Sequence, residues 1–226
     1  MKQLGLRLPQ WGGRRRGAGR KSAPGSRPGV RHERRASLTG REPLHVTMRL
    51  ERRLPSLRTK PVYRMVRTAI ERASERTGFA VVHYSVQRDH LHLIVEAADN
   101  GRLSRGLQSL GARVAKNLNQ MFRRRGRVFS DRYHLRILST PRATKAAILY
   151  VLNNAKKHAR QVGTKLSPSW VDPFSSARIF DGWLNFPERA TDYGVERPRL
   201  PAASTWLLRV GWRKHGLLDI ERVPSG

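Results

Sequence analysis

Hydrophobic and polar residues in the middle of the chain alternate in some segments and recur with helical spacing in others. From His45, the sequence His-Val-Thr-Met-Arg-Leu alternates and predicts a first strand. Apolar residues over 61–77 recur every three or four positions, which predicts a helix that Gly78 ends. Two strand-like runs follow, at residues 79–86 and 91–97, and the turn-like sequence Gln-Arg-Asp at 87–89 joins them. This pattern predicts a hairpin.

The next segment predicts another helix, another strand and then a third helix. A second helix is predicted over 103–124, and residues 128–138 have the pattern of a strand or extended chain. Thr140 and Pro141 predict the start of a third helix, because Thr is a favoured N-cap and Pro is tolerated at the first helical position. The order β-α-β-β-α-β predicts an α+β domain of the ferredoxin-like split βαβ type, with an antiparallel four-stranded sheet and two helices on one face.

Composition divides the chain into three parts. Residues 1–43 hold 12 of the 46 Lys and Arg residues and few large apolar ones, so we expect a basic disordered arm. Residues 44–160 form the predicted domain. Residues 161–226, rich in Pro and Trp, are expected to form a C-terminal extension with a small helical unit over 205–220.

The charge balance limits the class of partner. The chain has 46 Lys and Arg against 16 Asp and Glu, a net charge of +30, which predicts a polyanionic partner and by default a nucleic acid. The absence of cysteine excludes disulfides, thiolate metal sites and cysteine nucleophiles. The longest apolar run, residues 146–152, is too short to span a bilayer, and no apolar signal segment follows the Arg-rich start. We therefore expect a cytoplasmic protein without a membrane partner.

The sequence His90-Leu91-His92 is the first candidate for chemistry. Because side chains alternate along a strand, His90 and His92 project from one face while Leu91 and Leu93 project from the other. Two imidazoles on one face can hold a metal ion together, or they can be surface or hydrogen-bonded histidines. Ile94 disfavours a histidine-triad or metallo-β-lactamase-like site, which would have His or Asp at that position.

The second candidate lies on the predicted helix that covers residues 146–158. At about 100° per residue, Ile148 and Leu152 fall on the core face, whereas Tyr150 and Asn154 fall together on the opposite, polar face. This pattern fits an ordinary exposed tyrosine or a positioned one. A tyrosine hydroxyl attacks phosphate only when it is positioned and a nearby cation stabilises the developing charge, and the two histidines could hold that cation.

The two clusters together resemble the HUH single-tyrosine transposases. A hydrophobic residue separates the two histidines, and helical Tyr150-Val-Leu-Asn-Asn follows about sixty residues later. The segments 127–136 and 150–158 resemble especially the REP-associated branch of that superfamily. The resemblance covers about residues 44–160.

This resemblance implies a nuclease domain of the HUH endonuclease type that cuts single-stranded DNA beside a hairpin and keeps the 5′ phosphate on the tyrosine. Tyr150 then matches the nucleophile, His90 and His92 match the metal-binding pair, and Asn154 matches the polar third ligand. The family uses Mg²⁺ or Mn²⁺. Two imidazole ligands favour Mn²⁺, because Mg²⁺ prefers oxygen ligands, but the sequence does not decide between the two ions. Ala155 stands where the family often has Pro, so we expect the helix to continue past it.

Basic side chains are the candidates for holding the DNA backbone. They are Arg14, Arg15 and Arg16 in the arm, Arg123, Arg124, Arg125 and Arg127 before the fourth strand, and Lys156 and Lys157 after the tyrosine. The arm is either a solubilising tail or a segment that lies along phosphates, and the run before the fourth strand is either a solvated helix end or a DNA contact.

The predicted function is a transposase-type endonuclease that cuts and rejoins single-stranded or hairpin DNA. The main alternative is a non-cleaving hairpin-binding regulator that has kept the fold and charge. The combination of a tyrosine, two histidines and an asparagine favours the enzyme, because a binder does not need all four. A replication initiator or relaxase is less favoured, since the chain is short and has no helicase motifs. A homodimer is compatible with the sequence.

Overall fold

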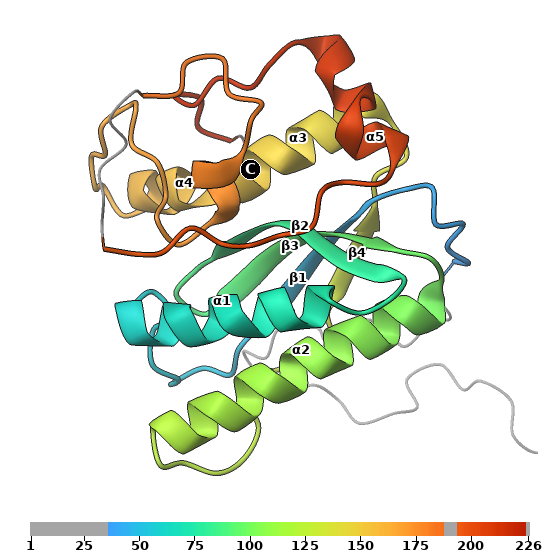
Figure 1. The fold of residues 1–226 in the computed structure, drawn as a ribbon. Coiled ribbons are helices and arrows are strands. Elements are labelled where there is room, and N and C mark those ends of the chain that lie inside the picture. Colours follow the sequence, from blue (N-terminus) through green and yellow to red (C-terminus); the bar gives the residue numbers. More distant parts are fainter. Residues whose placement is uncertain (1–35, 188–193, 225–226) are drawn as a thin grey trace, which may run out of the picture.

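The computed structural model describes residues 36–187 and 194–224, so Arg14, Arg15 and Arg16 lie outside the described residues (Figure 1). Strands and helices follow the predicted order β-α-β-β-α-β with a helix after it, and short helices follow. The elements are β1 (Leu44–Arg49), α1 (Lys60–Ser74), β2 (Phe79–Val86), β3 (His90–Ala97), α2 (Asn100–Met121), β4 (His134–Ile137), α3 (Pro141–Leu152), α4 (Asn154–Gln161), the 3₁₀ helix η1 (Ser176–Ile179), α5 (Trp206–Arg209) and the 3₁₀ helix η2 (Gly211–His215).

The four strands form one antiparallel sheet in the order β2-β3-β1-β4. In the central pair, Thr47 of β1 lies opposite His92 of β3, and Arg49 lies opposite His90. This arrangement confirms the predicted α+β fold with a ferredoxin-like sheet. It also puts the two histidines on a strand that has neighbours on both sides, so their backbone positions are firmly held.

Helices cover both faces of the sheet (Figure 1). Leu91, Leu93 and Val95 of β3 belong to the core that they share with buried residues of α1 and α2. Ile94 points to the opposite face, where it joins a second core with Ile148 of α3 and residues of the C-terminal extension. The histidines alternate with the leucines and therefore face α3 and α4.

Gly106 allows α2 to pack directly on the sheet. A Cβ atom at this position would lie 2.3 Å from Cγ of Phe79, which is too close for any side chain. The helix therefore approaches β2 at a distance that only glycine permits.

The helix that carries the tyrosine differs from the expectation that it would run on without interruption. Its N-cap is Thr140, as predicted, but α3 ends at Leu152 and α4 begins after a break at Asn153. The Asn153 side chain donates hydrogen bonds to the carbonyl oxygens of Ile220 and Arg222. The break therefore coincides with an attachment to the C-terminal extension and not with a proline.

The C-terminal extension packs on α3, and Trp212 is almost fully buried in their shared core. Glu96, near the end of β3, accepts hydrogen bonds from the backbone and hydroxyl groups of Ser204 and Thr205. The extension thus closes the face of the sheet that holds the histidines. Within the two described ranges, no helix combines the length and apolar character needed to cross a membrane.

Candidate active site

Two histidines of β3 face each other beneath α3 and α4. The Nε2 atoms of His90 and His92 are 3.1 Å apart, and the two rings are nearly perpendicular, with centroids 4.7 Å apart. Both residues are buried, with exposed fractions of 6% and 5%. The prediction that the two side chains share one face of the strand is therefore confirmed.

The second ring nitrogen of each histidine also has a partner. Nδ1 of His90 lies 2.7 Å from a carboxylate oxygen of Asp89, and Nδ1 of His92 lies 3.1 Å from the Thr47 hydroxyl and 3.2 Å from Nε2 of His45. Such partners orient metal-binding histidines and fix their tautomer. Because the carboxylate can only accept, it keeps a proton on Nδ1 of His90 and leaves the Nε2 lone pair available for a ligand.

Burial keeps this group of histidines neutral. Burial, together with the neighbouring His90 and His45, lowers the pKa of His92 to about 2. Burial also lowers the pKa of His90, although Asp89 opposes this shift. A neutral imidazole is the form that binds a metal ion, so the pair does not need to lose protons first.

Tyr150 of α3 lies edge-on against the histidines. Its ring centroid is 5.1 Å from that of His92, at an interplanar angle of 83°, and 5.7 Å from that of His45. Nζ of Lys157 lies 5.1 Å from the centroid of the tyrosine ring. The structure therefore brings the predicted nucleophile, one predicted metal ligand and a predicted DNA contact together.

Asn154 and His158 follow Tyr150 by four and eight residues, beyond the break at Asn153. The His158 ring lies 5.5 Å from that of His90, so the residues on both sides of Asn154 in this segment, Tyr150 and His158, have ring contacts with the histidine pair. Asn154 is completely buried, and neither its Oδ1 nor its Nδ2 has a hydrogen-bond partner among the described residues. The same holds for Nε2 of His158. Buried polar atoms without partners are costly, so this cluster has the donors of a ligand site.

The residues present fit a divalent ion. Two ligands at a right angle, each about 2.1 Å from an octahedral ion, are about 3.0 Å apart, which is close to the separation of the two Nε2 atoms. Oδ1 of Asn154, the predicted third ligand, is an oxygen without a hydrogen-bond partner among the described residues. Over the described residues, no group of three or more His, Cys, Asp or Glu side chains could hold an ion, so the fit depends on the asparagine amide.

Comparison with known proteins identifies the family. A family model described as "Transposase IS200 like" matches residues 42–154, half of the chain. The chain belongs to the IS200-like transposase family. The matched range contains the histidine pair, the tyrosine and Asn154.

The fold of this IS200-like protein is also similar to those of solved structures. One is a REP-associated tyrosine transposase bound to a REP hairpin, with a TM-score of 0.55 and 17% identity over 76% of this chain and 100% of that chain. Another is a putative transposase from Deinococcus radiodurans R1, with a TM-score of 0.38 and 14% identity over 62% of this chain and 100% of that chain. No curated protein matches the chain. The first structure supports the fold described above.

The arginines predicted to contact DNA lie in the loop between α2 and β4 of the IS200-like domain. Arg123 and Arg125 are exposed. Arg124 donates hydrogen bonds within the loop region, and Nε of Arg127 lies 3.6 Å from the Glu51 carboxylate. Arg127 therefore joins this loop to the segment that follows β1.

Lys156 is not where the sequence led us to expect it. Its exposed fraction is 5%, and its Nζ donates hydrogen bonds to the carbonyl oxygens of Pro168 and Ile220. The Lys156 ammonium group is buried and bonded to carbonyl oxygens of the same chain, so it is not placed to contact a DNA phosphate. The C-terminal extension covers this side of α4, which the helical pattern alone does not reveal.

Three residues of the site were not among the sequence candidates: His45, Thr47 and His158. His45 and Thr47 alternate on β1 in the same way as the histidines on β3, and this spacing was the available signal. His158 stands eight residues after Tyr150 on the tyrosine side of the helix, which was a weaker signal.

Proposed function

We propose that the protein cuts and rejoins single-stranded DNA beside a hairpin, with Tyr150 as the nucleophile and a 5′-phosphotyrosine as the covalent intermediate. The observation that carries this proposal is the position of the Tyr150 ring against His92, whose Nε2 faces that of His90. The buried amide of Asn154, four residues after Tyr150, has no hydrogen-bond partner among the described residues and supports it. Membership of the IS200-like transposase family supports a DNA-cleaving reaction.

In the proposed reaction, the Tyr150 hydroxyl oxygen forms a bond to the scissile phosphorus, and the bond between phosphorus and the 3′ oxygen breaks. The tyrosine loses its proton, and the leaving oxygen takes one up to become a 3′-hydroxyl. Rejoining is the reverse, with a 3′-hydroxyl as the attacking group. The phosphotyrosine ester conserves the bond, so no nucleoside triphosphate is required.

His90, His92 and Asn154 would hold Mg²⁺ or Mn²⁺. When bound, the ion polarises the scissile phosphate and offsets the charge that develops on it. Asp89 orients His90 so that its Nε2 faces the site. Nζ of Lys157 lies beside the ring of Tyr150, where a negative charge appears when the hydroxyl loses its proton.

Replacing Tyr150 with Phe tests the proposal, because the change removes only the hydroxyl group. We expect wild-type protein with Mn²⁺ to form a covalent adduct with labelled hairpin DNA from the flanks of its own gene, seen on a denaturing gel. Tyr150→Phe should form no adduct while hairpin binding is retained. Tyr133→Phe is the matched control, since Tyr133 packs against the core of α1 and α2, and it should behave as wild type.

Each other result has a definite meaning. Undiminished adduct formation by Tyr150→Phe would exclude Tyr150 as the nucleophile. An adduct that forms equally well in excess chelator would exclude the divalent ion. Hairpin binding without any wild-type adduct would favour the alternative function, a non-cleaving hairpin-binding regulator.

A further inference from the structure

Two separate pockets border the histidine and tyrosine cluster. A larger one, of about 860 Å³, is lined by residues that include His90 and His158, and a smaller one, of about 500 Å³, is lined by residues that include His45 and Tyr150. The strand register places His45 and His90 on opposite sides of the pair formed by Thr47 and His92. The two pockets therefore lie at opposite ends of the reaction centre.

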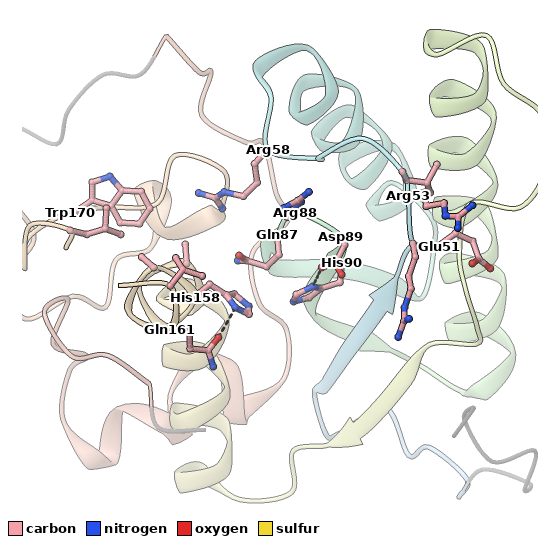
Figure 2. Close-up of a pocket in the computed structure, with 16 residues that line it drawn as sticks. Glu51, Arg53, Arg58, Gln87, Arg88, Asp89, His90, His158, Gln161 and Trp170 are labelled. Atoms are coloured by element: carbon pink, nitrogen blue, oxygen red, sulfur yellow. Dashed lines mark hydrogen bonds and ion pairs between the residues drawn. The ribbon is translucent and has the colours of Figure 1, made fainter. Parts of the chain in front are cut away.

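The larger pocket combines exposed arginines with an indole ring. Arg52 and Arg53 follow β1, Arg88 lies in the turn between β2 and β3, and Trp170 comes from the C-terminal extension. Figure 2 shows Trp170 and Arg53 at opposite ends of the pocket, with Arg88 and His90 between them. We call this pocket the arginine–tryptophan groove.

The charges of this groove favour an anionic ligand. Its two carboxylates already have cationic or hydrogen-bonding partners, since Glu51 lies beside Arg127 and Asp89 bonds His90. Arg52, Arg53 and Arg88 form no ion pair with any described residue. Arginines for phosphates and an aromatic ring for bases are the two components of sites that bind single-stranded nucleic acid.

The direction of attack assigns a strand to each pocket. In a displacement at phosphorus, the attacking and leaving oxygens lie roughly in line on opposite sides of the phosphorus atom. Tyr150 borders the smaller pocket, so the leaving 3′ oxygen points away from that pocket and toward His90. DNA that continues from the 3′ oxygen then enters the arginine–tryptophan groove.

We propose that the arginine–tryptophan groove binds the single-stranded DNA segment upstream of the cut, which ends in the free 3′-hydroxyl after cleavage. Its bases stack on Trp170 and its phosphates contact Arg52, Arg53 and Arg88. The groove keeps this end at the reaction centre until it attacks the phosphotyrosine. This assignment rests on the function proposed above, because it uses Tyr150 as the attacking group.

Photo-crosslinking tests which strand occupies the groove. The cut site is first mapped with wild-type protein, and single-stranded oligonucleotides are then made with one 5-iodouracil either upstream or downstream of that site. Tyr150→Phe protein keeps the strand intact during irradiation. We expect upstream probes to crosslink to the peptide that contains Trp170 and downstream probes to leave it unmodified.

Binding measurements test the groove independently of cleavage. Trp170→Ala should weaken binding of single-stranded DNA by about fivefold to a hundredfold, the effect of losing one base stacked on an aromatic ring. Arg88→Ala should reduce the slope of log K against log salt by about 0.7, the effect of one lost phosphate contact. The controls are Trp206→Ala, an exposed tryptophan that lines neither pocket, and Arg105→Ala, an exposed arginine of α2 on the other face of the sheet.

The possible outcomes are distinguishable. Crosslinking of Trp170 by downstream probes alone would overturn the strand assignment while leaving the groove as a DNA site. Equal affinities of Trp170→Ala and Trp206→Ala would overturn the groove itself. If wild-type protein forms no adduct, the proposed function fails and the strand assignment falls with it, whereas the binding measurements still decide whether the groove takes single-stranded DNA.

Discussion

Two neighbouring asparagines at the break between α3 and α4 have opposite surroundings. Both are buried, with exposed fractions of 3% for Asn153 and 0% for Asn154. The Asn153 amide donates to two carbonyl oxygens, whereas the Asn154 amide has no partner among the described residues. The hydrogen bonds of Asn153 therefore stabilise the fold. The buried amide of Asn154 lowers the free energy of unfolding unless a ligand binds to it.

Asn154→Leu should separate these two effects, because leucine has nearly the same shape and no polar atoms. We expect the free energy of unfolding to rise by about 1–3 kcal/mol, the penalty of a buried polar group without a partner. Urea denaturation in chelator measures this change. Isothermal titration with Mn²⁺ should show at least a tenfold loss of affinity, because a proposed direct ligand is removed.

Asn153→Leu is the matched control at the adjacent position. It should lower the free energy of unfolding, since the carbonyl oxygens of Ile220 and Arg222 lose their donor. A fall in stability for both variants would show that the Asn154 amide is satisfied in solution and not reserved for a ligand.

At the scale of elements, β3 connects the proposed reaction centre to the C-terminal extension. The strand begins with the histidine pair and near its end has Glu96, whose carboxylate accepts hydrogen bonds from four donors on Ser204 and Thr205. Thr205 is also the N-cap of α5. This single carboxylate therefore fixes the start of the last helical segment against the central sheet.

Glu96→Gln should loosen the attachment of the extension, because an amide has only one accepting oxygen in place of two. We expect the free energy of unfolding to fall by about 1–3 kcal/mol and amide hydrogen exchange to increase over residues 204–212. Glu75→Gln, at an exposed position after α1, should leave both measurements unchanged. If Glu96→Gln alters neither, the extension is held by its apolar contacts alone.

Local patterns were sufficient to predict most elements and the shared face of His90 and His92, because alternation and helical spacing are properties of adjacent residues. The contact of His45 with His92 depends on β1 lying beside β3, which is a long-range feature. The burial of Lys156 depends on Ile220, more than sixty positions away. Contacts of this kind have no signature in the local sequence, and they account for what the sequence did not predict.

At the scale of the whole molecule, positive charge greatly exceeds negative charge, and 12 of the 46 Lys and Arg residues fall within residues 1–43. Residues 1–35 lie outside the described residues, so their role stays a prediction from sequence. Gly and Pro are frequent among these arginines, so the sequence predicts no scaffold that would aim them at base edges. We expect it to add affinity without sequence preference.

Deleting residues 1–35 should weaken binding to hairpin and unrelated DNA alike. Each lost phosphate contact should lower the slope of log K against log salt by about 0.7 for single strands. Titrations of both DNAs at several salt concentrations measure these changes, and an unchanged thermal midpoint would show that the domain still folds. A truncated protein that keeps its affinity and slope but loses its preference for the hairpin would identify the segment as a reader of sequence.

The attachment of α4 to the C-terminal extension has a consequence for the stoichiometry of the reaction. Asn153 and Lys156 fasten the end of the tyrosine helix to the carbonyl oxygens of residues on the same polypeptide, and Tyr150 faces His92 of that polypeptide as well. Tyr150, the proposed nucleophile, thus meets the histidine pair without exchange of a helix between two molecules. For the cleavage proposed above, one protein molecule at the DNA is then sufficient, and we expect the initial rate to follow the first power of the protein concentration.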